Sequence, residues 1–310
     1  MANTFLTPDV IARQALASLY ETTVMLPLVY TDVASEFGAS KIGDTVNIRK
    51  PAVFTANEFD RATGIVLQDA TEGNIPVKLD RIADVSFEVT SEEMTLDIEA
   101  FDAQLLTPAM EAISQKIDRD LLSLRDDIIQ SAGVAPSASD EDKLLVWSRP
   151  ENLIEAGRLL NIKNVPLNER RAVVGPTTNA RWLNSDVLKH ADKSASTDAL
   201  RNASIGRNLF GMDAYWTQNV GQPATTPATG EPTTEQGVAF HRTAFALASA
   251  PLQSPPGSNA VVMNYKGISI RIVSQYDIKY KSAIISLDTL YGVKTLDPNR
   301  AVLLQGALKA

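Results

Sequence analysis

Residues 265–304 form an almost continuous run of β-strand pattern, and this run constrains the fold more than any other feature of the sequence. Apolar residues recur along it, at Ile268, Ile270, Ile272, Ile284, Leu287, Val293 and Val302. A strand is stable only when another strand satisfies its backbone groups, so these segments must pair with partners far back in the sequence. The stretch LYGVKTLDPNR near the end holds strand, glycine, strand and turn but no catalytic group, which favours a structural use for the tail.

Two more alternating runs lie in the first third of the chain. In the first run, Val46 and Ile48 alternate with polar residues, and the nearby Pro51 excludes a central position in a sheet. The second run, residues 82–90, has the same period of two. We expect the two runs to pair as a long hairpin across the polar stretch 55–76. A hairpin that projects beyond its own core needs another molecule to pack against.

The strongest helical signal lies between Thr107 and Gly133. Its apolar residues follow one another at spacings of four, four, three and four, at Ile113, Ile117, Leu121, Leu124 and Ile128. Thr107 and Pro108 supply the start and Gly133 the end, which predicts a helix ~39 Å long. The charged residues on its other face are expected to be solvated: Glu111, Lys116, Asp118, Arg119, Asp120, Arg125, Asp126 and Asp127.

Shorter helices and strands alternate over residues 149–250. The sequence predicts helix, strand, helix and strand in the stretches RPENLIEAGRLLNIKN, RRAVVGP, TTNARWLNSD and DAYWTQN, in that order. This alternation favours a compact α/β layer unit. The polar stretch 220–237 within it is expected to be an exposed, mobile loop. At the other end of the chain, residues 8–22 predict a helix with one narrow apolar stripe, typical of an arm.

Charge and cysteine content exclude several classes of protein. The 310 residues contain 29 Lys and Arg against 37 Asp and Glu, a net charge of −8. Such a chain is a poor general binder of nucleic-acid phosphates, so DNA nearby would be enclosed rather than gripped. The chain has no cysteine, which excludes disulfides and thiolate chemistry and suits a reducing cytoplasm. No export signal and no apolar run near the ~18 residues that span a bilayer are present, so we expect no membrane association.

No catalytic or metal-binding constellation stands out in the sequence. His190 and His241 are far apart and have no cysteine to assist them, so both are expected to be structural. One acidic stretch offers carboxylates, at Glu92, Glu93, Asp97, Glu99 and Asp102, but a helix would scatter them around its axis. No phosphate-binding loop, nucleophile elbow, dinucleotide fingerprint or EF-hand motif occurs. We expect no enzyme activity, no cofactor and no metal, and we expect Trp147, Trp182 and Trp216 to be core or layer-packing residues rather than a ligand cage.

Taken in order, these segments resemble the major capsid (coat) proteins of tailed bacteriophages, which share the Hong Kong 97 fold. The stretch LTPDVIARQALASLYETTVMLPLVYTDVASEFGASKIGDTVNIRKP is similar to the N-terminal arm leading into the extended loop of that family, and PAMEAISQKIDRDLLSL is similar to its long spine helix. The stretches RRAVVGPTTNARWL, IGRNLFGMDAYWTQNV and GVAFHRTAFALASAPL look like successive parts of its axial domain. The tail resembles the final strands of the family.

The resemblance implies an α+β fold of Hong Kong 97 type with five parts. These are an N-terminal arm (1–44), an extended β-hairpin loop (45–90), a peripheral domain with the spine helix (91–150), an axial α/β domain (151–265) and C-terminal strands completing both sheets (266–310). The implied function is a subunit that self-assembles into the pentamers and hexamers of an icosahedral virion capsid. Assembly would occur in the cytoplasm of the bacterial host, with a scaffolding protein and a portal as partners, around double-stranded DNA that is bound without sequence specificity.

The extended loop is the expected site of contact between subunits. The first ~90 residues have too little apolar surface to fold alone, so the loop from Lys50 to Pro76 is expected to lie over an adjacent copy. The charged residues available for pairing across that seam are Glu58, Asp60, Arg61, Asp69 and Glu72. Two alternatives stay open. An encapsulin-like nanocompartment shares the fold and encloses protein, and a metal-dependent hydrolase would use the acidic stretch from Glu92 to Asp102.

Overall fold

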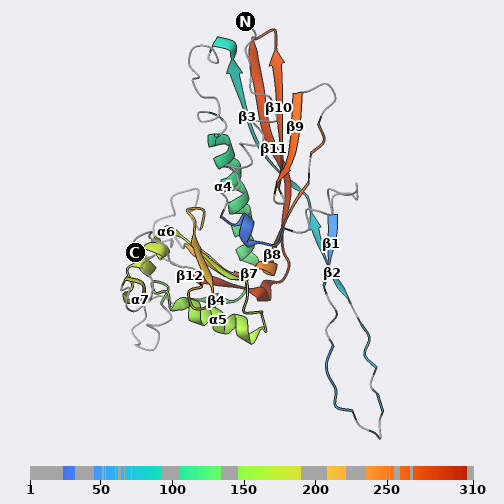
Figure 1. Ribbon diagram of the computed structural model, residues 1–310, viewed down its shortest axis with the longest axis vertical. Coiled ribbons are helices and arrows are strands. Elements are labelled where there is room, and N and C mark those ends of the chain that lie inside the picture. The colour runs from blue at the N-terminus through green and yellow to red at the C-terminus, as the bar shows by residue number, and fades with distance from the viewer. Residues whose placement is uncertain are drawn as a thin grey trace.

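The structure is a computed structural model that describes residues 24–31, 45–50, 52, 54–59, 61, 64–65, 67–70, 72–92, 105, 107–133, 146–189, 208–220, 235–250, 252–254, 259–265 and 268–305. Figure 1 shows an upright sheet flanked by a long helix, a second sheet below it, and a narrow ribbon that extends away from both. No helix among these residues is both long and apolar enough to cross a membrane. The predicted helix at 8–22 and most of the predicted loop at 220–237 lie outside the described residues.

The upright sheet of Figure 1 is built around the tail of the chain. Strand β11 (Ser282–Thr295) pairs antiparallel with β10 (Ile268–Asp277) on one side and with β3 (Arg81–Thr90) on the other. Strand β9 (Asn259–Tyr265) continues the sheet beyond β10, and β8 (Phe245–Ala250) pairs with the second half of β11. Because Ser282 pairs with Thr90, the prediction that the tail pairs far back in the sequence is confirmed.

Helix α4 (Thr107–Ser123) packs along one face of this sheet (Figure 1). Ile113, Ile117 and Leu121 of the predicted apolar stripe are buried in the main core. That core also contains Ile285 and Leu287 of β11, so apolar contact with the sheet supplies most of the stabilisation of the helix. The predicted start of the helix and the face that it buries are therefore confirmed.

The predicted end of this helix at Gly133 is wrong. The α-helical part stops at Ser123 and continues as a 3₁₀ helix, η3 (Leu124–Asp127), after which Ile128 is extended. Strand β4 (Ser131–Ala132) then pairs parallel with β12 (Ala301–Gln305), and the carbonyl of Gln130 accepts the N–H of Leu303 at 2.8 Å. Residues 130–132 are thus bonded to a strand from the tail and do not continue the helix. Helical periodicity alone could not indicate this pairing.

The lower sheet is buried on both faces. Its strand order is β4, β12, β7 (Gln236–His241), β5 (Arg170–Val174) and β6 (Asp213–Trp216). Along β5, Val173 faces the main core, whereas Ala172 and Val174 face a second core. That second core lies under α5 (Asn152–Ile162), α6 (Pro176–Leu183) and α7 (Asp186–Lys189). The predicted sequence of helix, strand, helix and strand is confirmed for α5, β5, α6 and β6.

The predicted hairpin joins the wrong pair of strands, as the narrow ribbon in Figure 1 shows. Strand β1 (Thr45–Lys50) pairs antiparallel with β2 (Gly73–Lys78), with Ile48 opposite Ile75. It does not pair with the run at 82–90, which forms β3 and pairs with β11 along its whole length. The period of two identified both strands correctly, but several strands share that period, so it could not select the partner.

The expectation that the first ninety residues depend on neighbours is wrong for two described segments. Residues 24–31 include the 3₁₀ helix η1 (Leu26–Leu28) and enter the main core, where Met25 and Leu26 are buried. At the base of the ribbon, Val46 and Val77 pack against β8 in a third core. Both segments complete the core of their own chain, so the need for a neighbour is confined to a smaller region.

His241 has the structural role predicted for it. Its Nδ1 accepts the N–H of Thr243 at 3.3 Å and so begins a 3₁₀ helix, η5 (Arg242–Ala244). Burial and the nearby Arg300 lower the pKa of the imidazole, which keeps the ring neutral and able to accept this bond. A second 3₁₀ helix, η6 (Pro298–Arg300), begins in the same way, because the side chain of Asp297 accepts the N–H of Asn299. His190 lies outside the described residues.

Glu235 caps helix α6 from a distant part of the sequence. Its two carboxylate oxygens accept the N–H groups of Thr177 and Thr178, each at 3.0 Å. Gly175 leaves room for this contact, because a Cβ there would lie 2.5 Å from Oε2 of Glu235. We expect Glu235→Ala to lower the free energy of unfolding by about 1–2 kcal/mol, since two N–H groups lose their acceptor. Chemical denaturation would measure the change.

The matched control for this cap is Glu169→Ala. The Glu169 carboxylate is more exposed and meets Arg242 at 3.4 Å, and such a surface pair contributes about 1 kcal/mol or less. Equal losses of stability in the two variants would show that Glu235 does not act as a cap.

Candidate assembly interface

The segment between β1 and β2 carries the largest apolar surface that the ribbon exposes. Four of its side chains are between 61% and 91% exposed: Phe54, Phe59, Ile65 and Leu67. Figure 1 shows this segment extending from the body as a long open loop. Soluble chains seldom leave several large apolar side chains this exposed within one segment unless another surface covers them. We call residues 52–72 the extended loop.

Sequence reasoning missed these four apolar residues as contact candidates. The signal was present, because they are the large apolar side chains of an otherwise polar stretch that also carries Val53 and Val66. The charged residues predicted for the interface lie in the same loop. Glu58, Arg61, Asp69 and Glu72 are exposed, whereas Asp60 lies outside the described residues. The structure of one chain brings none of the four into a contact between copies, so their role stays a prediction.

A side-chain clamp joins the two arms of the extended loop beyond the last strand pair. The N–H of Thr55 donates to the side-chain oxygen of Gln68 at 2.9 Å, and the side-chain amide of Gln68 donates back to the carbonyl of Thr55. Gln68 thus makes the two hydrogen bonds that a paired backbone residue would make, beyond the end of the β1–β2 pairing at Lys50 and Gly73. Measured from the last strand pair to the tip near Arg61, each extended arm of the loop spans roughly 35–40 Å. This length is enough to reach across a neighbouring chain.

The loop is anchored where its return strand crosses β11. Gly292 of β11 has no room for a side chain, because a Cβ there would overlap the carbonyl oxygen of Lys78, the last residue of β2. Beside this crossing, Leu79 packs with Ala248 of β8 in the third core. The base of the loop is therefore rigid, and its direction is fixed by backbone contact.

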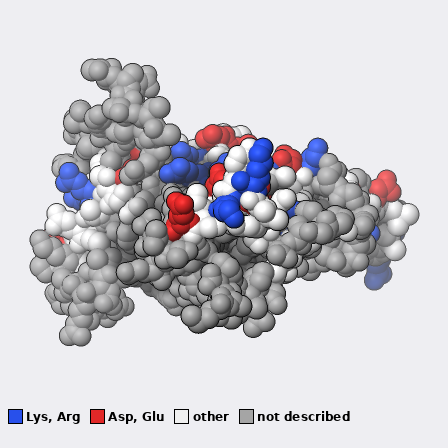
Figure 2. All heavy atoms as spheres, turned by 90° about the horizontal axis from the view of Figure 1, so that it is seen from above, with Lys and Arg blue, Asp and Glu red and all other residues white. Residues whose placement is uncertain are grey.

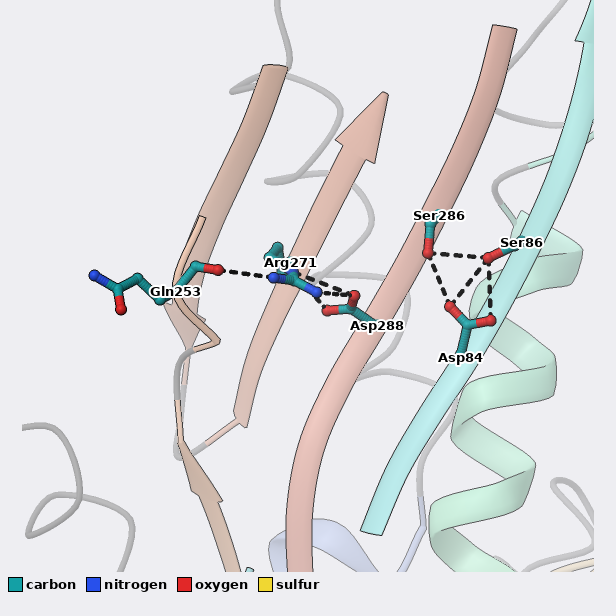
Figure 3. A network of polar contacts seen from close by, with 6 residues as sticks. All are labelled: Asp84, Ser86, Gln253, Arg271, Ser286 and Asp288. Carbon is teal, nitrogen blue, oxygen red and sulfur yellow. Dashed lines mark hydrogen bonds and ion pairs between the residues drawn. The ribbon is translucent and has the colours of Figure 1, made fainter. Parts of the chain in front are cut away.

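A polar network covers the face of the upright sheet that lies away from α4 (Figure 3). Arg271 donates three hydrogen bonds to the Asp288 carboxylate, the shortest at 2.5 Å, and a fourth to the carbonyl of Gln253 at 2.7 Å. On the neighbouring strand, Asp84 accepts hydrogen bonds from Ser86 and Ser286. Asp84 and Asp288 lie directly opposite each other in the strand register.

This network ties three strands together through side chains. Its hydrogen bonds to Asp288 raise the pKa of Arg271, so the guanidinium stays charged. The two carboxylates are satisfied separately, Asp288 by Arg271 and Asp84 by the two serines. We interpret this face as a stiffened platform rather than a reaction centre.

The prediction of a solvated face on α4 is wrong for three of its charged residues. Asp118 is buried and accepts the N–H of Met25 at 3.3 Å, which holds the segment 24–31 against the helix. Asp120 is partly buried. Burial alone would raise its pKa, but hydrogen bonds from Tyr291 and Lys116 lower it. Beyond the end of α4, Arg125 donates to the carbonyl of Gln236 at 2.9 Å. These side chains join the helix to both sheets.

Asp118 predicts a dependence of stability on pH. Burial raises its pKa from 3.8 to about 6, although hydrogen bonds from Met25, Asn219 and Val24 act in the opposite direction. The folded chain therefore binds this proton more tightly than the unfolded chain does. The contribution to stability is largest below pH 3.8, falls as pH rises to about 6, and is constant above that. The total change is on the order of 3 kcal/mol.

The variant Asp118→Asn should remove that slope. Midpoints of denaturant unfolding, measured for both proteins between pH 4 and pH 7, would show the wild type losing stability across the range relative to the variant. Parallel curves for the two proteins would mean that Asp118 does not titrate in this window.

The described residues contain no group of three or more His, Asp or Glu side chains that could hold a metal ion. Most of the acidic stretch from Glu92 to Asp102 lies outside those residues. Trp182 is fully buried and donates to the carbonyl of Trp147 at 2.8 Å, as expected for a core residue. Trp216 is 44% exposed on the edge strand β6, so it is not a core residue.

Figure 2 shows the molecule from above, with charges of both signs on the same face. Among the described residues drawn there, Lys and Arg side chains lie next to Asp and Glu side chains and do not gather into a patch of one sign. Nucleic-acid backbones are bound through clustered cations. This face therefore lacks that arrangement in its described part, consistent with the net charge of −8.

Known structures share this architecture, although no family model and no curated protein matches the sequence. A chain from the structure of Mycobacterium phage Che8 aligns with a TM-score of 0.67 over 91% of this chain and 90% of that chain, at 20% identity. A chain from the capsid structure of the cyanophage P-SCSP1u aligns with a TM-score of 0.58 over 93% and 89%, at 13% identity.

A third structure, described as a virus-like particle from Pyrococcus furiosus, aligns with a TM-score of 0.52 over 96% of this chain and 98% of that chain, at 10% identity. At these identities the matches establish the fold alone. The chain has the mixed α+β fold of tailed-phage capsid structures, and the fold expected from the sequence is confirmed at that level.

Proposed function

We propose that this chain is the major capsid protein of a tailed double-stranded DNA bacteriophage and that it self-assembles into an icosahedral shell around the genome. The observation that carries the proposal is the fold match over nine tenths of both chains to a phage structure. The exposed apolar side chains of the extended loop add an independent reason for self-association. The role is structural, with no catalytic step.

The parts of the fold take the following roles in this proposal. Residues 1–44 are the arm, and the β-hairpin that carries the extended loop spans 45–80, since β3 belongs to the upright sheet. The upright sheet and α4 form the peripheral domain, and the lower sheet with α5 and α6 forms the axial domain. The tail serves both, because β10 and β11 lie in the upright sheet and β12 in the lower one.

Assembly would proceed through heterologous contacts, in which one surface of a copy meets a different surface of the next. Such contacts close into rings when the rotation between copies allows it, here into pentamers and hexamers. Burial of the loop would supply most of the affinity, whereas charged pairs involving Glu58, Asp69 or Glu72 would set register, because exposed pairs contribute only ~0–1 kcal/mol. Assembly would occur in the bacterial cytoplasm with a scaffolding protein and a portal.

A nanocompartment shell is the second candidate, and the match to the virus-like particle from Pyrococcus furiosus favours keeping it. The two candidates differ in what the shell encloses. A wall of net charge −8 per chain suits DNA that must be packed and released without adhering.

Electron microscopy of the purified protein, alone and with a co-expressed scaffolding partner, tests the proposal. We expect closed shells with fivefold and sixfold rings. Nucleic acid inside particles recovered from infected cells would identify the phage capsid, and a protein cargo would identify the nanocompartment. Small uniform oligomers under all conditions would contradict both.

A further inference from the structure

Residues 24–31, which we call the strap, join the upright sheet to the lower sheet. Two backbone hydrogen bonds, at 3.0 and 3.1 Å, connect Tyr30 of the strap to β8 of the upright sheet. Arg171 of β5, in the lower sheet, donates to the carbonyl of Pro27 at 3.1 Å. Figure 1 shows the strap in blue beside α4. The strap is therefore a second connection between the two sheets, in addition to the tail of the chain.

The third attachment of the strap is a buried carboxylate that has no cation beside it. Asp118 of α4 is 1% exposed. Its Oδ1 accepts the N–H of Met25 at 3.3 Å, and its Oδ2 accepts the N–H of Val24 at 3.4 Å and the side-chain amide of Asn219 at 3.3 Å. Among the described residues no Lys, Arg or His forms an ion pair with it. A buried charge without a counter-charge is costly, whereas the neutral acid is not.

The charged and titratable side chains of the surrounding elements are placed away from this carboxylate. Tyr30 of the strap packs in the third core, and Arg171 of β5 donates to the backbone of the strap. On α4 itself, Asp120 pairs with Lys116 at 3.0 Å and Arg119 is exposed. Burial and the three donors therefore decide whether the carboxylate holds a proton.

We propose that the protonation of Asp118 regulates the docking of the strap, which is held more tightly when the carboxylate binds a proton and is released more readily when the carboxylate is ionised. Acid conditions would then strengthen the connection between the upright and lower sheets. The inference goes beyond the proposed capsid role, because it concerns a conformational equilibrium within a single chain.

The direction of the effect follows from the two environments of the carboxylate. In the docked strap, burial raises the pKa of Asp118 from 3.8 to about 6, although hydrogen bonds from Met25, Asn219 and Val24 act in the opposite direction. Once the strap is released, the carboxylate faces water and its pKa returns to 3.8. Docking is therefore strongest below pH 3.8, weakens as pH rises to about 6, and is constant above that.

The strap can leave its site without unfolding the rest of the chain. It is not a member of either sheet and meets β8 only through the isolated bridge between Tyr30 and Ala246, whereas β8 keeps its pairing with β11. Segments with few backbone hydrogen bonds open locally before the whole fold does. Burial of four apolar side chains, Met25 and Leu26 among them, favours the docked form at every pH. The proton therefore shifts this equilibrium and does not reverse it.

Hydrogen exchange with mass spectrometry tests the proposal on the full chain in dilute solution. We expect the amides of the strap to exchange faster than those of β11, which shows local release. After correction for the intrinsic pH dependence of exchange, the ratio of released to docked strap should rise about tenfold between pH 5 and pH 7, as the two pKa values of Asp118 require. Asp118→Asn should abolish this rise. The matched control Glu111→Gln, which removes an exposed acid from the same helix, should keep it.

Three results would overturn the inference. Strap amides that exchange no faster than those of β11 would show that the strap opens only when the whole chain unfolds. A wild-type ratio that is constant between pH 5 and pH 7 would exclude the proton, whether or not the variants fold. A rise that persists in Asp118→Asn would assign the effect to another group. All three are measured on single chains, so they leave the capsid role intact, whereas a failure to form shells would remove that role and leave the strap equilibrium in place.

Discussion

Gly292→Ala is expected to destabilise the chain by about 3 kcal/mol or more, because no side chain fits where the return strand of the extended loop crosses β11. An added Cβ would overlap the carbonyl oxygen of Lys78 and lie 2.8 Å from its carbonyl carbon and 3.2 Å from the Cα of Leu79. These are backbone atoms, so a change of rotamer cannot relieve the overlap. One strand must move away from the other, and Gly292 pairs with Ala248 on β8 at the same point.

Gly73→Ala is the matched control for this substitution. Gly73 begins β2 in the same ribbon, and a Cβ there would meet Lys50 at 3.6 Å, an ordinary contact. We expect its stability to stay within about 0.5 kcal/mol of the wild type. Denaturant unfolding of both variants would measure the difference. A Gly292→Ala protein as stable as Gly73→Ala would mean that the two strands separate at this crossing without cost.

The same glycine shows what the sequence could and could not predict. The stretch LYGVKTLDPNR was identifiable as strand, and its distant pairing followed from the lack of any local partner. The close approach of Lys78 to Gly292 was not identifiable, because the two residues are far apart in the sequence and nothing in either segment encodes the crossing. Local patterns predict elements, whereas the contacts between elements depend on the whole chain.

The charged face of α4 shows a second limit. The sequence analysis assigned Asp118 and Asp120 to a charged face of the helix, for which exposure was the natural expectation. In the structure two other parts of the chain contact these carboxylates, residues 24–31 at Asp118 and Tyr291 of the tail at Asp120. A carboxylate that accepts backbone N–H groups looks the same in sequence as one that faces water.

The position of the projecting loop could be predicted from the sequence, but its exposed apolar side chains were not recognised. The loop between the first strands was correctly identified as a projecting segment, and its charged residues were chosen as the contacts. In the structure Phe59, Ile65 and Leu67 are highly exposed. Burying these side chains against a neighbour would contribute more free energy than pairing the charged residues. Their exposure could not be assessed from sequence, because it depends on which other parts of the chain pack against the loop.

The triple variant Phe59→Ser, Ile65→Ser and Leu67→Ser is expected to fold normally and to fail in assembly. The three side chains are between 64% and 91% exposed in the single chain, so removing them costs the monomer little. Burying each one against a neighbour contributes about 1.5–3 kcal/mol. The loss of all three raises the concentration needed for assembly by about 10³-fold or more, at 1.4 kcal/mol for each factor of ten. Light scattering and electron microscopy would follow assembly, and circular dichroism would follow folding.

A charge variant of the same loop separates affinity from register. Glu58→Gln combined with Asp69→Asn removes two exposed charges, and we expect less than about a tenfold change in the assembly concentration, because exposed pairs are weak. Its effect should also shrink at high salt, whereas the effect of the apolar triple variant should persist. If the charge variant blocks assembly and the triple variant assembles normally, the loop acts through its charges. Apolar burial would then no longer explain why this chain projects four large apolar side chains into solvent.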